Sequence, residues 1–356
     1  MGCKSVFLLY NALGHTNNTY KSKKVKYYEH KKFDLICSFF IFQGILFKKY
    51  HKKEEKHGKK WTNIYLEKKN VDITGSCDLH IHSGPDCVER WGDTIDIARV
   101  AVEMGMRAIV FKDHFRPTTH KAILTNRAVP DIDCFSLHAC NHPQGGINYR
   151  CVMMSVEEGV KVIQMPTMDS LHQHSKPKQG HLFTHFKFGQ KVEPISIYNP
   201  GTKQLTDDLH KIIEAVIKND LILSNGHLSP EETFNLFKAA KRKSKKAKLM
   251  VEHPNGNAAF THDWVKKIAA QGALHNISYN ACNPLFAGKH PREAAAMIKA
   301  VGPQHCTLIT DGGNHTSPPP AIGMEVFANM MNFCGISKKD IDTMIKKNPA
   351  KILGLK

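Results

Sequence analysis

From Ile73 onward the chain alternates short apolar runs with stretches of helical periodicity, and this repeat constrains the fold more than any other feature. The apolar runs have the length of β-strands, and helix start signals such as Ser229-Pro230-Glu231-Glu232 open several of the stretches between them. The strand-like runs are Cys77–His82, Ala108–Lys112, Ile132–Ala139, Val160–Met165, Leu221–Gly226, Leu249–His253, Leu274–Tyr279 and Cys306–Asp311. The helical patterns include Thr94–Met104, Thr206–Lys218, Pro230–Ala240, His262–Gln271 and Pro291–Val301.

A strand followed by a helix, repeated eight times, is typical of a parallel α/β protein. The near-even spacing favours a closed (β/α)₈ TIM barrel over an open doubly wound sheet. The interval from Met165 to Leu221 is about twice as long as the others. It predicts an insertion after strand 4, roughly residues 170–205, with an extra strand at Pro194–Tyr198. Since no glycine-rich phosphate-binding motif follows any run, dinucleotide and P-loop sites are excluded.

The first seventy residues differ from the rest in charge. They hold 16 Lys against five acidic residues, a net charge of +11 out of +18 for the whole chain. We therefore predict a basic, poorly ordered extension over residues 1–70 and a hydrolase domain with C-terminal helices over residues 71–356. The apolar run Leu35–Phe47 is shorter than the roughly 20 residues that span a bilayer, so no transmembrane segment is expected. A basic membrane-surface anchor is the alternative for this extension.

The remaining residues are only mildly basic, so nucleic acid is not an expected partner. The ten cysteines are scattered and none forms Cys-x-x-Cys, which indicates a reducing, cytoplasmic setting and argues against a thiolate metal site.

Polar residues close several of the apolar runs. A His-x-His pair, His80 and His82, closes the first run, His227 and His253 close the fifth and sixth, and Asp311 closes the last. The carboxyl ends of barrel strands meet at one mouth, so these side chains are expected to converge there. Neutral imidazole and carboxylate suit Zn²⁺ and similar divalent ions, and a carboxylate beside an activated water can take its proton. This combination predicts a metal site.

The pattern resembles the amidohydrolase superfamily, metal-dependent hydrolases on a (β/α)₈ barrel, over about residues 73–315. The resemblance implies that His80, His82, His227, His253 and Asp311 hold one or two divalent ions, most readily zinc. It also implies that Asp311 handles the proton of the attacking water.

One departure concerns the bridging ligand. Two-metal members of that superfamily carry a carboxylated Lys or a Glu at the end of strand 4, whereas this strand ends Gln164-Met165-Pro166-Thr167. Lys112 closes strand 2 and faces inward by alternation, so we place it with Asp311 as a catalytic candidate. A relocated bridge, a charged substrate contact and an ordinary ion pair all stay open for Lys112.

Three further residues are candidates for substrate binding: His114 after strand 2, His172 in the insertion and Asn280 after strand 7. With His174, His181 and His185, His172 forms a histidine group that is expected to overhang the mouth, although a polar surface loop is the simpler interpretation.

The sequence thus predicts a metal-dependent hydrolase of a small-molecule amide, cyclic imide, lactone or phosphoester. A non-oxidative decarboxylase using the same site is one alternative. A non-catalytic protein that binds acidic lipid or nucleic acid through residues 1–70 is another. A homo-oligomer is left open.

Overall fold

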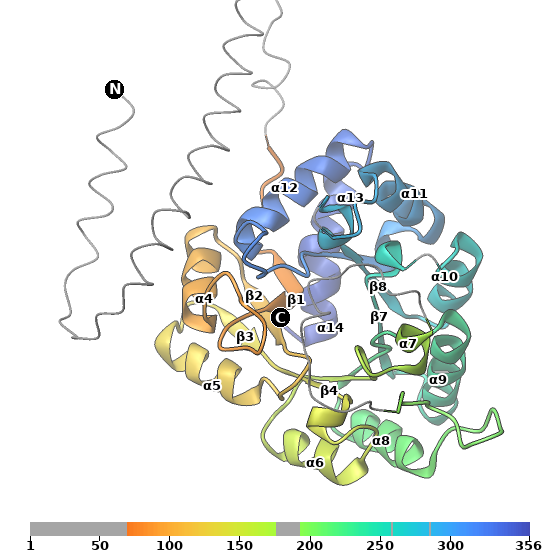
Figure 1. Cartoon of the computed structure of the whole chain (residues 1–356). Helices are drawn as coiled ribbons and strands as arrows, with labels where there is room; N and C mark the ends of the chain where they lie inside the picture. The colour runs from red at the N-terminus through yellow and green to blue at the C-terminus, as the bar shows by residue number, and fades with distance from the viewer. Residues whose placement is uncertain (1–69, 176–192, 258, 285) are drawn as a thin grey trace, which may run out of the picture. The chain divides into compact units, whose positions relative to one another are not determined.

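The computed structural model describes residues 70–175, 193–257, 259–284 and 286–356. Nearly all of the predicted basic extension lies outside these residues. Within them the predicted alternation of strands and helices is confirmed, and the helices surround the strands (Figure 1). None of the helices in the described ranges has the length and apolar character needed to cross a membrane.

The strands are β1 (Cys77–His82), β2 (Ala108–Lys112), β3 (Asp133–Phe135), β4 (Leu137–Ala139), β5 (Val162–Gln164), β6 (Ile222–Ser224), β7 (Lys248–Glu252), β8 (Leu274–Ser278) and β9 (Cys306–Ile309). The main helices are α4 (Thr94–Glu103), α5 (Thr119–Ala128), α6 (Tyr149–Glu157), α8 (Asp207–Lys218), α9 (Pro230–Lys243), α10 (His262–Ala269), α11 (Pro291–Val301) and α12 (Pro320–Phe333). Shorter helices are α7 (Leu171–His174), α13 (Lys338–Asp342) and α14 (Asn348–Leu353).

All strand pairs are parallel, but they form two sheets: β1-β2-β3 and β4-β5-β6-β7-β8-β9. The single strand predicted over Ile132–Ala139 is therefore interrupted at Ser136. Thr118 explains the interruption, because its hydroxyl accepts from Leu137 N at 2.8 Å and its N–H donates to Leu137 O at 3.1 Å. These bonds take the place of a β2 ladder at Leu137, so the pairing does not close into one continuous ring.

Hydrogen bonds also join the two edges formed by β1 and β9. Asp311 N donates to His80 O at 3.0 Å, and His82 N donates to Gly312 O at 2.9 Å. Deeper, the Asp78 carboxylate accepts from Thr310 Oγ1 at 2.5 Å and from Thr310 N at 3.2 Å. The carboxyl ends of the first and last strands are thereby fixed side by side.

The hydrophobic core has two parts. Side chains on the outer face of the strands, such as Ile109 and Phe111, pack against the surrounding helices. Side chains on the inner face form a separate inner core, which α14 completes with Ile352 and Leu353. In Figure 1, α14 lies at the centre of the view, behind the strands. The strand residues of the inner core are Cys77, Leu79, Ala108, Val110, Leu137, Ala139, Val162, Ile222, Met250 and Ile309.

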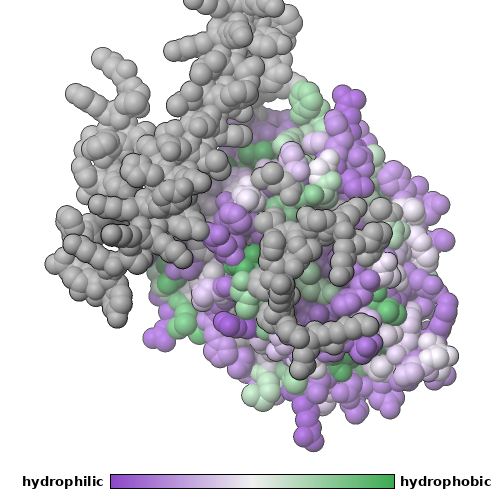
Figure 2. All heavy atoms as spheres, in the orientation of Figure 1, coloured by the Kyte–Doolittle hydropathy of each residue, from purple (hydrophilic) through white to green (hydrophobic). Residues whose placement is uncertain are grey.

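Local sequence signals account for the helix starts. The predicted start at Ser229 is confirmed: its hydroxyl accepts from Glu232 N, the Glu232 carboxylate accepts from Ser229 N, and Pro230 takes the first helical position. The outer helices present mainly hydrophilic residues, as Figure 2 shows for one face. This burial pattern agrees with helices that cover a sheet on one side and meet water on the other.

The predicted insertion lies only partly in the described residues, which lack 176–192. Its described parts contain α7 and isolated bridges, Ser170 with Ile195 and Tyr198 with Leu205. The extra strand predicted at Pro194–Tyr198 is thus wrong: Ile195 and Tyr198 each make one isolated bridge, and no strand forms between them.

Candidate metal centre

A bulge in β1 positions the His-x-His pair. Cys77 and Asp78 pair with Ala108 and Ile109, but the next pairing is Ile81 with Phe111, so β1 contains one residue more than β2. At this extra residue the alternation breaks: Leu79 lies in the inner core, and His80, next to it, contacts Glu252 and Asp311 at the site. Plain alternation along the run could not have predicted both.

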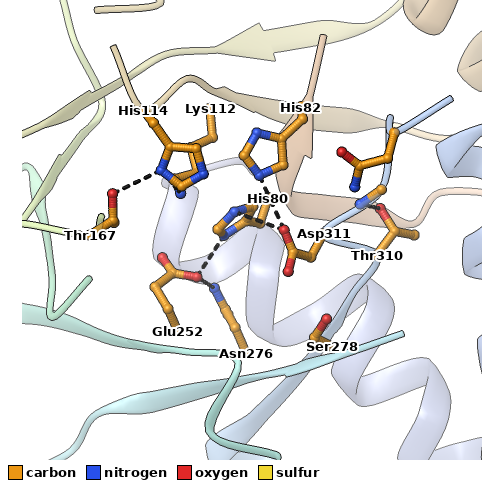
Figure 3. A network of polar contacts seen from close by, with 12 residues as sticks. His80, His82, Lys112, His114, Thr167, Glu252, Asn276, Ser278, Thr310 and Asp311 are labelled. Carbon is orange, nitrogen blue, oxygen red and sulfur yellow. Dashed lines mark hydrogen bonds and ion pairs between the residues drawn. The ribbon is translucent and has the colours of Figure 1, made fainter. Parts of the chain in front are cut away.

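Asp311 lies two residues after the end of β9 at Ile309 and faces the histidine pair. Its Oδ1 is 3.3 Å from His80 Nε2 and 3.2 Å from His82 Nε2 (Figure 3). Its φ is +50°, a conformation that non-glycine residues seldom adopt and that is common at functional sites. Side-chain exposure is 18% for Asp311, against 0% for His80 and 5% for His82, so the carboxylate is the member open to solvent.

Five imidazoles form one cluster at the carboxyl ends of the strands. We call His80, His82, His114, His227 and His253 the histidine cluster. Going round it, neighbouring ring centroids are 5.3, 5.1, 6.2, 4.9 and 5.7 Å apart, in the order His80, His82, His114, His227, His253 and back to His80. The predicted convergence of the histidines is therefore a feature of the structure, and His114 joins it.

Two glycines permit the close packing around this cluster. A Cβ on Gly313, whose φ is +100°, would lie 1.8 Å from His82 O. A Cβ on Gly226, whose φ is +56°, would lie 2.2 Å from Met165 O. Both positions require glycine, since other residues are strained at such φ values and would also clash with backbone.

Within the described residues, His80, His82 and Asp311 form the group suited to a metal ion, with one ligand atom of each within 4.8 Å of the others. His80 Nε2 is buried without a hydrogen-bond partner among the described atoms, and it is the nitrogen that faces Asp311. Neutral imidazoles with a carboxylate are a normal donor set for Zn²⁺, so the residues present fit a divalent ion. His227 and His253 lie outside this compact group, on the other side of the cluster.

Glu252 is a site residue that the sequence analysis missed. Its Oε2 accepts from His80 Nδ1 at 2.8 Å and from Asn276 Nδ2 at 3.1 Å, and its Oε1 accepts from Ser224 Oγ at 2.8 Å and Gln164 Nε2 at 3.1 Å. Bonding at Nδ1 leaves the Nε2 lone pair of His80 for a ligand, as in carboxylate–histidine–metal arrangements. The sequence did contain a signal for Glu252, because a Glu inside an apolar run must find polar partners when it is buried.

The surroundings of these groups set their charge. Burial alone raises the pKa of Glu252, but the His80 charge and hydrogen bond, with smaller effects of His253 and Ser224, lower it to about 2. Burial lowers the pKa of His253 to about 4 and holds that of His82 well below its usual value. His82 and His253 are therefore held in the neutral form, in which imidazole binds a metal, and Glu252 is held in the ionised form, in which it accepts from His80 Nδ1.

A family model described as a family of unknown function, DUF6282, matches residues 75–276. The chain belongs to this family. No curated protein matches this chain.

Solved structures similar to this DUF6282 protein share its fold at low sequence identity. A zinc-bound amidohydrolase from Burkholderia multivorans has a TM-score of 0.51 at 10% identity, with 79% of this chain and 99% of that chain covered. A mutant of organophosphorus hydrolase from Deinococcus radiodurans has a TM-score of 0.50 at 11% identity, covering 80% and 95%. A 2,6-dihydroxybenzoate decarboxylase has a TM-score of 0.50 at 10% identity, covering 79% and 100%. The resemblance to amidohydrolases is confirmed at the level of fold.

The other predicted site residues of the DUF6282 chain lie outside the group of His80, His82 and Asp311, each with its own contacts. Lys112 is fully buried, with Nζ 3.2 Å from His114 Nδ1. His172, in α7, is half-buried with Nε2 3.4 Å from Asn257 Nδ2. Asn280 is buried and its N–H donates to Thr310 O at 3.1 Å. Of the predicted overhanging histidines, His181 and His185 lie outside the described residues.

Proposed function

We propose that this protein is a metal-dependent hydrolase that cleaves an amide, cyclic imide, lactone or phosphoester. The observation that carries the proposal is the convergence of His80, His82 and Asp311 at adjoining strand ends, with their ligand atoms within 4.8 Å. We infer further that the two sheets together make a (β/α)₈ barrel. Thr118 and the hydrogen bonds between β1 and β9 would bridge its two gaps in strand pairing.

His80, His82 and Asp311 would hold the ion, with His227 and His253 as further ligands toward the other side of the cluster. A divalent ion supplies a Lewis acid and lowers the pKa of water, so that a nucleophile forms near neutral pH. Zinc is the ion that this donor set suits best.

The chain's own residues supply the rest of the mechanism. The Asp311 carboxylate, the most exposed member of the group, takes the proton of the attacking water at its oxygen and passes it to the leaving group. Glu252 holds His80 in the orientation and tautomer that presents Nε2. The buried imidazoles around this point limit the access of other water, which strengthens electrostatic interactions with the substrate.

A non-oxidative decarboxylase is the second candidate, favoured by the similar fold of the dihydroxybenzoate decarboxylase. Product analysis separates the two reactions, because hydrolysis places solvent oxygen in the product and decarboxylation releases carbon dioxide.

The test starts with elemental analysis of the purified full chain, followed by a screen of amides, lactones and phosphoesters. We expect about one or two divalent ions per chain, and near-complete loss of metal in His80→Asn and His82→Asn. His120→Asn is the matched control, since the His120 side chain is 76% exposed and its partner is Glu158. Metal content unchanged in both site variants, or full activity after chelation, contradicts the proposal.

A further inference from the structure

The loop between β1 and α4 contacts the segment of chain that follows Asp311. Trp91 N donates to Gly313 O at 2.8 Å, and Arg90 forms an isolated antiparallel bridge with Asn314. Asn314 is three residues from a proposed metal ligand, but it is not a member of the proposed metal group. These contacts therefore join the site to a loop that the proposed function leaves without a role.

The Arg90 side chain adds buried contacts to these backbone contacts. Its Nη1 donates to Asn314 Oδ1 at 2.6 Å, and its Nε donates to Asp86 Oδ2 at 2.7 Å. Its Nη2 also lies 2.6 Å from Asp86 Oδ2, and the two side chains are 1% and 0% exposed, so water screens neither charge. We call Arg90, Asp86 and Asn314 the arginine clamp, because one guanidinium joins the loop to the segment after Asp311.

The chemistry of the arginine clamp suits a device that fixes geometry. Taking both charges of a buried ion pair out of water offsets much of their attraction, so apolar side chains of similar volume would stabilise a loop as well. What a guanidinium adds is direction, since its donors lie in one plane at fixed angles. Arg90 therefore holds the Asp86 carboxylate and the Asn314 amide oxygen in one fixed arrangement.

The segment that the arginine clamp holds follows directly on strained backbone. Asp311 has a φ of +50°, a conformation that costs free energy in a residue other than glycine and persists only where surrounding contacts enforce it. The backbone of β1 supplies two such contacts: Asp311 N donates to His80 O at 3.0 Å, and His82 N donates to Gly312 O at 2.9 Å. The side-chain bond to Asn314 is a further contact, and it comes from the loop after the strand.

We propose that Arg90 is a positioning residue that keeps the Asp311 carboxylate within reach of the metal ion, by holding Asn314 and thereby the turn after Asp311. Its side chain is 1% exposed, so it acts through that turn and not on a substrate. This inference rests on the proposed function, in which Asp311 is a metal ligand. With the clamp broken, residue 311 relaxes toward an ordinary φ and its carboxylate moves away from His80 and His82, whereas β1 keeps the two imidazoles in place.

The first experiment measures backbone amide hydrogen exchange in the metal-free full chain, so its result does not depend on the ion. Asp311 N bonds to His80 O only while the segment keeps its conformation, so Arg90→Met should exchange the Asp311 amide about 10-fold faster than the wild type. Exchange at Val162 in β5 should not change. Equal exchange at Asp311 in Arg90→Met and the wild type overturns the proposal.

A second variant and a control separate this role from general stability of the loop. Asn314→Ala leaves the buried ion pair intact and removes only the bond to the segment, so it should also speed exchange at Asp311. Lys121→Met is the matched control, because Lys121 Nζ bonds to Ser83 O at 2.9 Å, at the start of the same loop, and its loss should leave exchange at Asp311 unchanged. An effect in Lys121→Met as large as that in Asn314→Ala overturns the proposal.

The second experiment reads the ligands of the ion in the cobalt-loaded full chain. The visible spectrum of Co²⁺ depends on the number of its ligands, so Asp311→Ala marks the spectrum without the carboxylate. Arg90→Met should shift the spectrum toward that of Asp311→Ala and weaken cobalt binding about 10-fold. Adding Arg90→Met to Asp311→Ala should cause no further loss of affinity, because the effect runs through Asp311. A wild-type spectrum in Arg90→Met, or additive losses of affinity, overturns the proposal.

The two experiments also separate this proposal from the proposed function. A wild-type chain that binds no metal contradicts the hydrolase, while amide exchange still decides whether the arginine clamp holds Asp311.

Discussion

His80 and His114 are two imidazoles of one cluster, and they differ in the group behind the ring. His80 Nδ1 donates to the Glu252 carboxylate at 2.8 Å, whereas His114 Nδ1 faces the Lys112 ammonium at 3.2 Å. The hydrogen bond to Glu252 leaves the lone pair of His80 on Nε2, whereas the ammonium beside His114 can only donate to the ring. The same residue type thus has opposite charges behind its ring at two places in one cluster, and we expect the two imidazoles to respond differently when that neighbour is removed.

The largest expected effect concerns the backbone beside His82. Gly313→Ala combines an unfavourable φ of +100° with a Cβ 1.8 Å from His82 O, and should lower the free energy of unfolding by roughly 2–5 kcal/mol. Gly159→Ala is the matched control, because its φ is +88° with no atom within 4 Å of the Cβ, and should cost about 1 kcal/mol. Denaturant unfolding measures both, and equal losses contradict the packing argument.

The comparison itself is tested by removing, one at a time, the charge behind each ring. Glu252→Gln removes the carboxylate from His80 and should weaken metal binding about 10- to 100-fold, measured by competition with a chelator. Lys112→Met removes the ammonium from His114 and should leave metal binding no weaker than in the wild type. Similar losses of metal affinity in the two variants would falsify the claim that the charge behind each ring sets how that imidazole behaves.

The smallest effect is expected for a buried histidine outside the cluster. His138 on β4 bonds through Nδ1 to Ser155 Oγ at 2.8 Å, and burial lowers its pKa to about 4. Because the folded pKa lies below the unfolded value near 6.5, this group's contribution to stability is complete above pH 6.5 and falls as pH drops toward 4.

His138→Gln should therefore reduce the loss of stability between pH 7 and pH 5.5 by about 1 kcal/mol, measured by denaturant unfolding at both pH values. Its metal content should equal that of the wild type. An unchanged pH dependence would show that His138 is not a neutral buried group.

Much of this arrangement could be predicted from sequence, because it follows from periodicity and from where parallel strands end. The bounds of β1 and β2 match the predicted runs, and the predicted metal residues His80, His82 and Asp311 do meet. What could not be predicted depends on register between distant segments. The bulge in β1 and the contact of Thr118 with Leu137 depend on such register. So do the hydrogen bonds by which Thr167 Oγ1 contacts Asn141 Nδ2 and His114 Nδ1. No local sequence pattern relates these residues.

Glu252 and Lys112 show that sequence alone does not predict the partners of a buried charge. Alternation placed Lys112 on the inner face, but whether its charge meets a carboxylate, a ligand or an imidazole is decided by neighbouring strands. The roles of such buried charges become readable only with the hydrogen bonds in view.

The position of α14 has a consequence for how the domain can be divided. Ile352 and Leu353 pack under β1 and its neighbours, so residues from both ends of the described domain complete one inner core. An amino-terminal fragment that stops after β6 would lack α14 and would expose the inner-core side chains of its strands to water. Split versions of the protein are thus expected to regain structure only when both pieces are present together, and contacts of such long sequence separation should make refolding slow.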